Sequence, residues 1–396
     1  MSPERTDVAV VGAGIVGCLV AREITARAPE ASVVLLDRDT VGAGASRRSA
    51  GLHCPRGATE RVRHMTAYSQ DYYARLKHRA PELPIHAVPM SVVASPANAA
   101  RVREIYLDSA ELTRIDTVTG SPAPCDPSGA PPGQDPSEQD PSGPPDLRLP
   151  EDARIWNCRG AQYADVYALV HDLARELRPR VTLREGVHVD AVRALTHASP
   201  GRDTSVSGVE LTLGTGETLT ADRVVLAPGP WLAEPAWREL LAPLGARVKK
   251  IVALHIERVP TRADRAVVFQ DEDAFLLPLH ASGHWLFSYT CTTWDVDPDD
   301  LVDGLSADDV DQARASLRRY APELAERCVS GRVFCDAYSP TGEPQVRALG
   351  EGRVVFAGTA NGSGYRLAPA IAAEAADLLD LSSIPPHAWE KQRSLS

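Results

Sequence analysis

Three glycines near the start of the chain have the spacing of a phosphate-binding turn. Gly12, Gly14 and Gly17 form a G-x-G-x-x-G pattern directly after the apolar run at 7–11. In such a turn the first glycine allows a tight bend, and the second lets an anion approach the amides at a helix N-terminus. The third lets the helix lie close to the strand. The residues expected at this pyrophosphate site are Gly12, Ala13, Gly14, Ile15, Val16 and Gly17.

An acidic residue follows at the distance expected for contact with a ribose. A second apolar run, 33–36, ends at Asp37, which stands twenty residues after Gly17, and Arg38 comes next. A carboxylate here accepts hydrogen bonds from the adenosine ribose and repels a 2′-phosphate, which favours FAD or NAD over NADP. A purely structural glycine turn is the alternative, but the strand, the spacing and the acid agree on a dinucleotide site.

The segment 41–57 favours FAD over NAD. It places small residues and two arginines directly after the second strand. Such a loop can wrap the pyrophosphate of an extended FAD and lead the chain towards the isoalloxazine. The cofactor contacts expected here are Ala45, Ser46, Arg47 and Arg48. For either arginine a solvated charge is the alternative.

Four separated blocks resemble the FAD-dependent amine and amino-acid oxidoreductases of the D-amino-acid oxidase superfamily, most of all the sarcosine oxidase and glycine oxidase branch. The blocks are residues 7–51, 160–192, 222–232 and 339–379, in the order that the family has them. In the family the second block lies beside the adenine, and the later two approach the flavin. The resemblance implies FAD contacts at Val189, Gly229, Cys335, Gly362, Ser363, Gly364 and Tyr365.

The expected fold class is α/β (α+β overall), with a Rossmann-like FAD-binding domain and an inserted, mainly antiparallel β-sheet substrate domain. The FAD-binding domain is expected to be discontinuous, and the substrate or cap domain is expected to interrupt it. The expected boundaries are 1–87, 148–240 and 336–385 for the first domain, and 88–120 and 241–335 for the second. Residues 121–147, rich in Pro, Gly, Ser and Asp, are expected to form a disordered insertion, since a lid would need apolar residues.

The resemblance implies the oxidation of a small amine, secondary amino acid or cyclic imino acid. Hydride transfer to flavin N5 and reoxidation by O₂ to give H₂O₂ would complete the reaction. Alternatives on the same scaffold are a flavin dehydrogenase, a 2-hydroxy-acid oxidase or a non-catalytic flavoprotein subunit. No G-x-S-x-G elbow, H-E-x-x-H pair or Walker loop indicates another chemistry.

Three residues are candidates for contact with the substrate. Arg366 stands where the sarcosine oxidase pattern has a carboxylate-binding lysine, and a guanidinium suits that task as a bidentate fork. The alternative is that Arg366 pairs with a nearby acid or faces solvent. His53 is expected to accept a proton from a substrate ammonium or to line the pocket. Tyr365, with Tyr289 and Trp285, forms either an aromatic wall or part of the core.

Several positions depart from the family. Cys335 stands where sarcosine oxidases link a cysteine to the flavin 8α carbon, although a buried apolar filler is the alternative. Ala337 replaces a carboxylate-binding arginine of glycine oxidases. The segment 284–290 lacks the lysine that activates O₂ in sarcosine oxidases. Lys249 or Lys250 could replace it, but not both, because adjacent strand residues face opposite ways. Solvated charges are the alternative.

Composition limits the partners. A net charge of −11 argues against nucleic acid, and no apolar run reaches the length of a transmembrane helix. Seven cysteines without paired spacing indicate neither a disulfide framework nor a metal site and fit a cytoplasmic location. The expected partners are a small amine or amino-acid substrate and O₂. The oligomeric state stays open.

Overall fold

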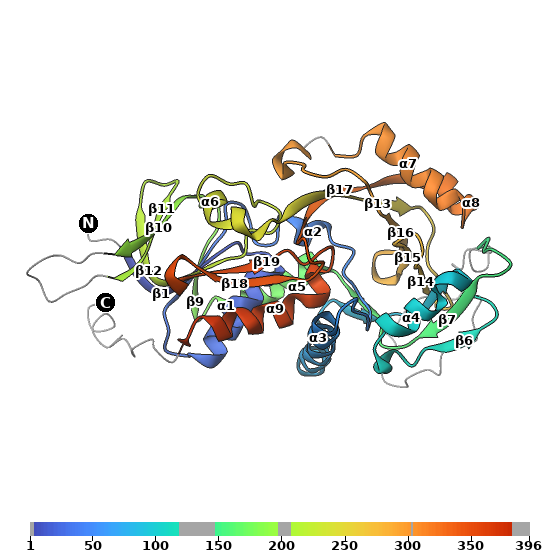
Figure 1. Cartoon of the computed structure of the whole chain (residues 1–396), viewed down its shortest axis with the longest axis horizontal. Helices are drawn as coiled ribbons and strands as arrows, with labels where there is room; N and C mark the ends of the chain where they lie inside the picture. Colours follow the sequence, from blue (N-terminus) through green and yellow to red (C-terminus); the bar gives the residue numbers. More distant parts are fainter. Residues whose placement is uncertain (1–3, 119–146, 197–206, 302–303, 382–396) are drawn as a thin grey trace, which may run out of the picture.

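The computed structural model describes residues 4–118, 147–196, 207–301 and 304–381. The insertion predicted at 121–147 lies outside these ranges except for Leu147, which packs against the core of the second sheet. The described residues form two large sheets and one small sheet, with helices packed on them (Figure 1).

The first sheet is built around parallel strands. Its order is β10-β11-β12-β1-β2-β9, and β19 pairs in parallel with the end of β12 and with β18 on its other side. The bounds are β1 (Glu4–Val11), β2 (Val33–Leu36), β9 (Val181–Arg184), β10 (Val189–Thr196), β11 (Ser207–Leu213), β12 (Thr218–Leu226), β18 (Gln345–Leu349) and β19 (Val354–Gly358). Every residue of β2 and β19 is buried, because both faces of a parallel sheet are covered.

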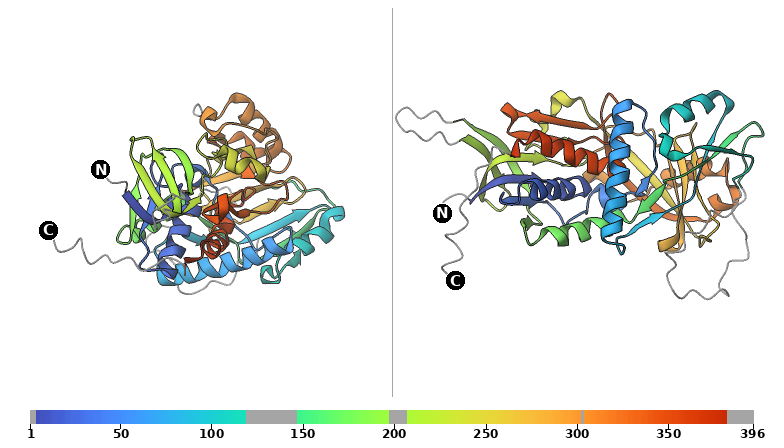
Figure 2. Two further views of the ribbon diagram at one scale, coloured as in Figure 1. Left: turned by 60° about the vertical axis from the view of Figure 1, so that its left-hand side comes forward. Right: turned by 90° about the horizontal axis from the view of Figure 1, so that it is seen from below.

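Four helices cover one face of this sheet. They are α1 (Ile15–Arg27), α3 (Glu60–Arg79), α5 (Val166–Leu177) and α9 (Gly364–Leu378). The long helix α3 crosses the ends of α1 and α9 in the right-hand view of Figure 2. On the opposite face of the sheet, buried side chains of β1, β2, β10 and β11 form one cluster with Trp237 and with Leu241 of α6 (Arg238–Leu241). None of the helices in the described ranges is long and apolar enough to cross a membrane.

The second sheet is mainly antiparallel. Its order is β17-β13-β16-β15-β14-β5-β7-β6, and the one parallel pair that the described strands form in it joins β5 to β14. The bounds are β5 (Met90–Ala94), β6 (Thr113–Ile115), β7 (Arg154–Cys158), β13 (Arg247–Ile256), β14 (Ala266–Phe269), β15 (Ala274–Leu279), β16 (His284–Tyr289) and β17 (Cys328–Tyr338). Helices α7 (Ala307–Arg318) and α8 (Pro322–Glu326) pack on it, and α4 (Ala99–Ile105) lies at its other end. A capping box between Ser306 and Asp309 begins α7.

Strand pairing corrects two of the boundaries drawn from the sequence. Residues 154–158 were expected in the first domain, yet they form β7 and pair with β5 and β6 of the second sheet. The boundary between 335 and 336 cuts β17, which pairs with β13 along its whole length. Both boundaries follow composition, which does not reveal distant strand partners.

The two large sheets lie side by side, and short segments join them (Figure 1). Between them are the short helix α2 (Ala45–Arg48) and the small sheet β3 (Leu52–His53), β8 (Gln162–Ala164) and β4 (Ile85–Ala87). Helix α5 begins at Val166 because β8 precedes it and the Asp165 side chain caps it.

Candidate active site

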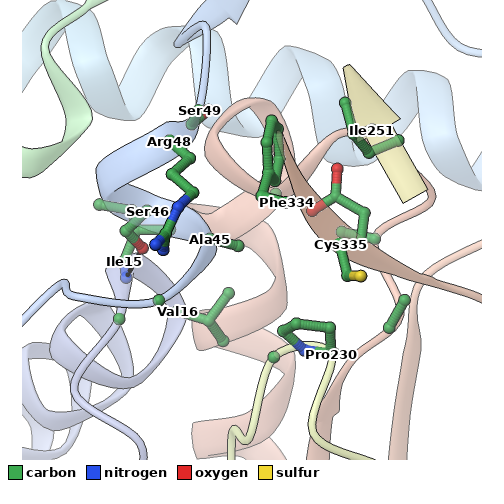
Figure 3. A pocket seen from close by; sticks show the side chains of 18 of the residues that line it. Ile15, Val16, Ala45, Ser46, Arg48, Ser49, Pro230, Ile251, Phe334 and Cys335 are labelled. Atoms are coloured by element: carbon green, nitrogen blue, oxygen red, sulfur yellow. Dashed lines mark hydrogen bonds between the residues drawn. The ribbon is translucent and has the colours of Figure 1, made fainter. Parts of the chain in front are cut away.

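A cavity of about 630 Å³ lies where the two large sheets meet. It begins at the carboxyl ends of β1 and β2, where ligands bind in open parallel sheets, and continues to β13, β17 and the start of α9. Figure 3 shows the part between α2, Pro230 and β17. The predicted cofactor residues other than Ala13 and Gly17 line this cavity, and so do two of the three substrate candidates, Arg366 and Tyr365.

The three glycines of the turn have different roles. A Cβ on Gly12 would lie 2.3 Å from the Ala227 oxygen, and one on Gly17 would lie 1.8 Å from the Gly12 oxygen. These two glycines are therefore required by the fold. A Cβ on Gly14 would meet only the Ser46 hydroxyl, at 3.2 Å, and would otherwise point into open space. Gly14 lines the cavity, as a pyrophosphate cradle requires.

Two of the amides expected at this cradle are engaged within the protein. The Ser46 hydroxyl accepts a hydrogen bond from the Ile15 amide at 3.0 Å and ties α2 to the start of α1 (Figure 3). The Asp37 carboxylate accepts one from the Ala13 amide at 2.7 Å. These bonds hold the turn and the acid together before any ligand is considered.

Asp37 has the position expected of a ribose acceptor. It lines the cavity at the end of β2, and its other oxygen accepts a hydrogen bond from the Asp39 amide at 2.9 Å. Burial raises the pKa of Asp37, and the two backbone hydrogen bonds oppose this shift. Val189 and Gly229, predicted from the resemblance, line the same end of the cavity.

Arg38 joins the two halves of the molecule instead of facing the cavity alone. Its guanidinium pairs with Glu234 at 2.9 Å, bonds Asp299 of the second half, and lies 4.4 Å from the Trp231 ring. The Trp231 indole also donates to Asp299 at 2.8 Å. Trp231 and Asp299 are 68 residues apart, and nothing in the local sequence indicates that they meet.

The two arginines of the phosphate-wrapping loop differ. Arg48 is half-buried, lines the cavity and donates to the Ala43 oxygen at 3.1 Å (Figure 3). Arg47 also borders the cavity, but its side chain is exposed and lies over the Tyr167 ring at 5.6 Å. Arg48 is therefore the better placed of the two for an anion.

The loop before α9 adopts an unusual backbone conformation. Thr359, Asn361 and Gly362 have φ values of 49°, 53° and 73°, in the left-handed region that side chains rarely adopt. The Asn361 side chain stabilises the loop by accepting from the Ser339 amide and donating to the Thr359 oxygen. Strained backbone of this kind concentrates at functional sites. The predicted contacts Gly362, Ser363, Gly364 and Tyr365 all line the cavity here.

Arg366 is a cation without an acidic partner in the described structure. Its guanidinium bonds the Ser363 hydroxyl at 2.5 Å and the Cys54 sulfur at 3.8 Å, while its Nε has no partner there. Burial lowers the pKa of Arg366; the Cys54 thiol opposes this shift and the neighbouring charge of Arg56 adds to it. The alternative that Arg366 pairs with an acid or faces solvent does not match this geometry.

His53 does not occupy the place expected of a base. It is fully buried, its ring packs edge-on against Tyr73 at 6.1 Å, and it is absent from the lining of the cavity. Burial and the charge of Arg366 lower the pKa of His53 to about 3. Because β3 turns this side chain inward, the next residue, Cys54, reaches the cavity instead.

Two of the three aromatic candidates line the cavity, and the third lies in the hydrophobic core. Tyr365 lines the cavity, stacks on Tyr73 at 4.6 Å and accepts a bond from Gln162 at 3.3 Å, so it is a rigid wall. Burial raises the pKa of Tyr365, which keeps its hydroxyl neutral. Tyr289 also lines the cavity, whereas Trp285 is buried in the core of the second sheet.

One of the two neighbouring lysines faces the cavity. The Lys249 ammonium lies 5.2 Å from the Trp294 ring and 5.5 Å from the Tyr338 ring, and Lys249 lines the cavity. Lys250 points the other way and pairs with Asp309 of α7 at 2.7 Å. Alternation along β13 therefore selects Lys249.

Cys335 borders the cavity from the face of the second sheet that it shares with Lys250, opposite to the face of Asp336. It is 2% exposed, and Figure 3 shows its side chain on β17 near Pro230. Burial and the nearby Asp336 raise the pKa of this thiol to about 12, so the neutral thiol predominates at pH 7. Cys125 lies outside the described residues, and the six other cysteines are unpaired.

We predict that the Cys335 sulfur forms a thioether with the 8α carbon of FAD. That carbon would lose a proton, and the two electrons released would pass to the flavin and then to O₂. After acid precipitation the yellow colour should remain in the protein pellet, and Cys335→Ser should release it into the supernatant. Because attack requires the thiolate, attachment to apoprotein mixed with FAD should accelerate as the pH rises towards 10. Complete recovery of flavin in the supernatant of the unmodified protein would show that Cys335 is a filler.

Comparison with known proteins agrees with this geometry. A family model described as "DAO: FAD dependent oxidoreductase" matches residues 7–378. No curated protein matches the chain by sequence. Solved structures with a similar fold include glycine oxidase from Geobacillus kaustophilus, with 20% identity over 95% of both chains and a TM-score of 0.69.

Two further structures share the fold. L-proline dehydrogenase from P. horikoshii is 14% identical over 97% of this chain and 95% of its own, with a TM-score of 0.73. NikD, an amino acid oxidase essential for nikkomycin biosynthesis, is 18% identical over 96% and 95%, with a TM-score of 0.71. At these identities the likeness concerns the fold.

Proposed function

Since the chain belongs to the DAO family of FAD-dependent oxidoreductases, we propose that it oxidises a small amine that carries a carboxylate. A secondary amino acid or a cyclic imino acid has this form. The proposed final electron acceptor is O₂, which would give H₂O₂. The structural neighbours are a glycine oxidase, an amino acid oxidase and an L-proline dehydrogenase, which supports an amino-acid substrate.

The observation that carries this proposal is the unpaired charge of Arg366. Its guanidinium has no ion pair with any described acid, lines the cavity, and lies near the second guanidinium of Arg56. Burial opposes the charged form of Arg56, whereas Tyr106, Cys54 and Asp273 raise its pKa, and Arg56 forms no ion pair with any described acid. Two neighbouring cations in a partly dry cavity favour an anionic ligand, because a carboxylate offsets the cost of their desolvation.

The residues present fit FAD. Gly14 leaves room for a pyrophosphate, Asp37 offers a carboxylate at the ribose position, and the start of α9 presents amides in its first turn. When bound, FAD accepts the hydride from the substrate carbon. The tasks left to the chain are to hold the carboxylate at Arg366, to orient the reacting carbon against the wall of Tyr365 and Tyr289, and to exclude water.

A matched set of compounds tests the proposed substrate class. It contains an amino acid, the amine that its decarboxylation would give, and the 2-hydroxy acid of the same skeleton. H₂O₂ formation should be fastest with the amino acid. Faster turnover of the hydroxy acid would support the 2-hydroxy-acid oxidase instead. Oxo acid without H₂O₂ would indicate a dehydrogenase.

Lys249 is proposed to assist the reaction with O₂. A fixed cation stabilises the negative charge that develops on O₂ as it accepts electrons. Lys249→Met should slow reoxidation of the reduced enzyme by about a hundredfold, with little change in anaerobic reduction by substrate. Lys250→Met should change neither rate, because the Lys250 side chain faces Asp309 and not the cavity. Equal reoxidation rates in Lys249→Met and the unmodified enzyme, measured by stopped flow, would remove Lys249 from the proposal.

We also propose a cytoplasmic location, as expected from the cysteine count.

A further inference from the structure

Asp336 is a further charged side chain that borders the cavity. It lies on β17 between Cys335 and Ala337, is half-buried and lines the cavity. The described residues give it no hydrogen bond and no ion pair. A half-buried carboxylate without a protein partner loses part of its hydration with nothing in return, and a cationic ligand would compensate for that loss.

The position of Asp336 relates it to the loop before α9. A Cβ on Gly362 would lie 4.0 Å from Asp336 Oδ2 and 2.9 Å from the Tyr338 hydroxyl. Asp336 and Tyr338 are two residues apart on β17 and therefore share a face. This loop leads into the first turn of α9, where Arg366 lies. Among the described residues, an acid without a cationic partner and a cation without an acidic partner thus border the same cavity, one beside this loop and the other in the helix that follows it.

Charged and titratable groups approach Asp336 from each neighbouring element. Lys249 lies directly opposite it in the β13–β17 register, but the ammonium lies over the rings of Trp294 and Tyr338 and forms no ion pair with the carboxylate. Its neighbours Cys335 and Tyr338 on β17 are themselves influenced by Asp297, after Trp294, and by Asp273, before β15. Arg366 of α9 lines the same cavity. Burial raises the pKa of Asp336 to about 7.

We propose that Asp336 binds the amino group of the substrate and accepts its proton before oxidation. The inference rests on the proposed function and narrows the substrate to an ammonium carboxylate, with the carboxylate at Arg366 and the ammonium at Asp336. One N–H bond of the ammonium breaks and one O–H bond forms on the carboxylate. The nitrogen keeps the electron pair that the oxidation requires. After product leaves, the carboxylic acid returns the proton to water.

The first test is the pH profile of Asp336→Asn. In the unmodified holoenzyme kcat/KM should rise about tenfold per pH unit below pH 7 and level off above it, because only the carboxylate accepts the proton. Asp336→Asn should lose about a hundredfold or more at pH 7 and recover near pH 10, where the substrate is already a free amine. Flavin content should not change.

Asp295→Asn is the matched control. It removes the same charge from an acid that pairs with Arg247 at the edge of β13, outside the cavity. Its pH profile should match that of the unmodified enzyme. A loss in Asp336→Asn that is equal at every pH would indicate a structural role and overturn the proposal, as would an unchanged profile.

The second test needs no turnover. Trimethylglycine and 3,3-dimethylbutanoate have the same shape and carboxylate, but only the first carries a positive charge on nitrogen. At pH 8.5 the holoenzyme should bind trimethylglycine more tightly, read from the perturbed flavin spectrum, and Asp336→Asn should abolish the difference. Equal binding of the two probes by the unmodified holoenzyme would overturn the assignment.

The two tests separate this inference from the proposed function. If amino acids reduce the flavin and Asp336→Asn keeps the normal profile, Asp336 is wrongly assigned and the function stands. If no amine reduces the flavin, the proposed function fails, and the charged probe still reports on Asp336.

Discussion

Arg366→Leu should lower kcat/KM for the amino-acid substrate by about thirtyfold to several thousandfold, equivalent to roughly 2–5 kcal/mol. In the cavity the substrate carboxylate has lost water, and only a charge-assisted pair replaces that hydration. The guanidinium is held by Ser363 and Cys54 and has no competing acid in the described structure. Flavin content should stay normal, because the N-terminal turn is distant in sequence and provides the main cradle.

Arg366→Lys separates charge from shape. It keeps a cation but loses the planar fork, so its loss should fall between those of the unmodified enzyme and Arg366→Leu. Stopped-flow reduction with substrate gives both the apparent affinity and the rate. If Arg366→Leu retains both, the carboxylate binds elsewhere, at Arg48 or Arg56, or the substrate is an uncharged amine.

Gly14→Val should give a folded protein that retains little FAD. Gly14 has φ −74° and ψ −175°, which valine adopts readily, and its Cβ would meet only Ser46. The added methyl groups would enter the space of the pyrophosphate, where overpacking costs about 1–3 kcal/mol, or roughly five- to 150-fold in affinity. Flavin absorbance per protein and the Kd of the apoprotein for FAD measure the effect.

Gly12→Val is the contrasting variant. Its Cβ would overlap the Ala227 backbone, and its φ of 101° suits glycine alone, so this change should lower the melting temperature sharply. Full FAD content in well-folded Gly14→Val would show that the turn does not hold the pyrophosphate.

Features set by local sequence could be predicted. The glycine turn, the strand that ends at Asp37 and the glycine-rich start of α9 each depend on neighbouring residues, and they meet at one cavity. The choice between Lys249 and Lys250 also follows from alternation along a strand, once the face towards the cavity is known.

Features set by tertiary contacts could not be predicted. β7 pairs with β5 and β6, whose paired residues lie at least 40 positions earlier in the sequence, and Arg38 meets Asp299 from the other half of the molecule. The position of His53 in its segment suggested a base, but the pairing of β3 with β8 turns it into the core. Asp336 was missed because a single acid in a strand looks like any solvated charge until its surroundings are known.

The proposed substrate class is tested most directly by mixing the holoenzyme anaerobically with each of three matched compounds. These are the amino acid, the amine that its decarboxylation gives and the 2-hydroxy acid. The absorption band of oxidised flavin reports the transfer of electrons from substrate without any contribution from O₂. If the substrate is an amine that carries a carboxylate, we expect rapid bleaching by the amino acid, much slower bleaching by the amine that lacks the carboxylate, and none by the hydroxy acid. Bleaching by the hydroxy acid alone, or by the decarboxylated amine as fast as by the amino acid, would contradict the proposed substrate class.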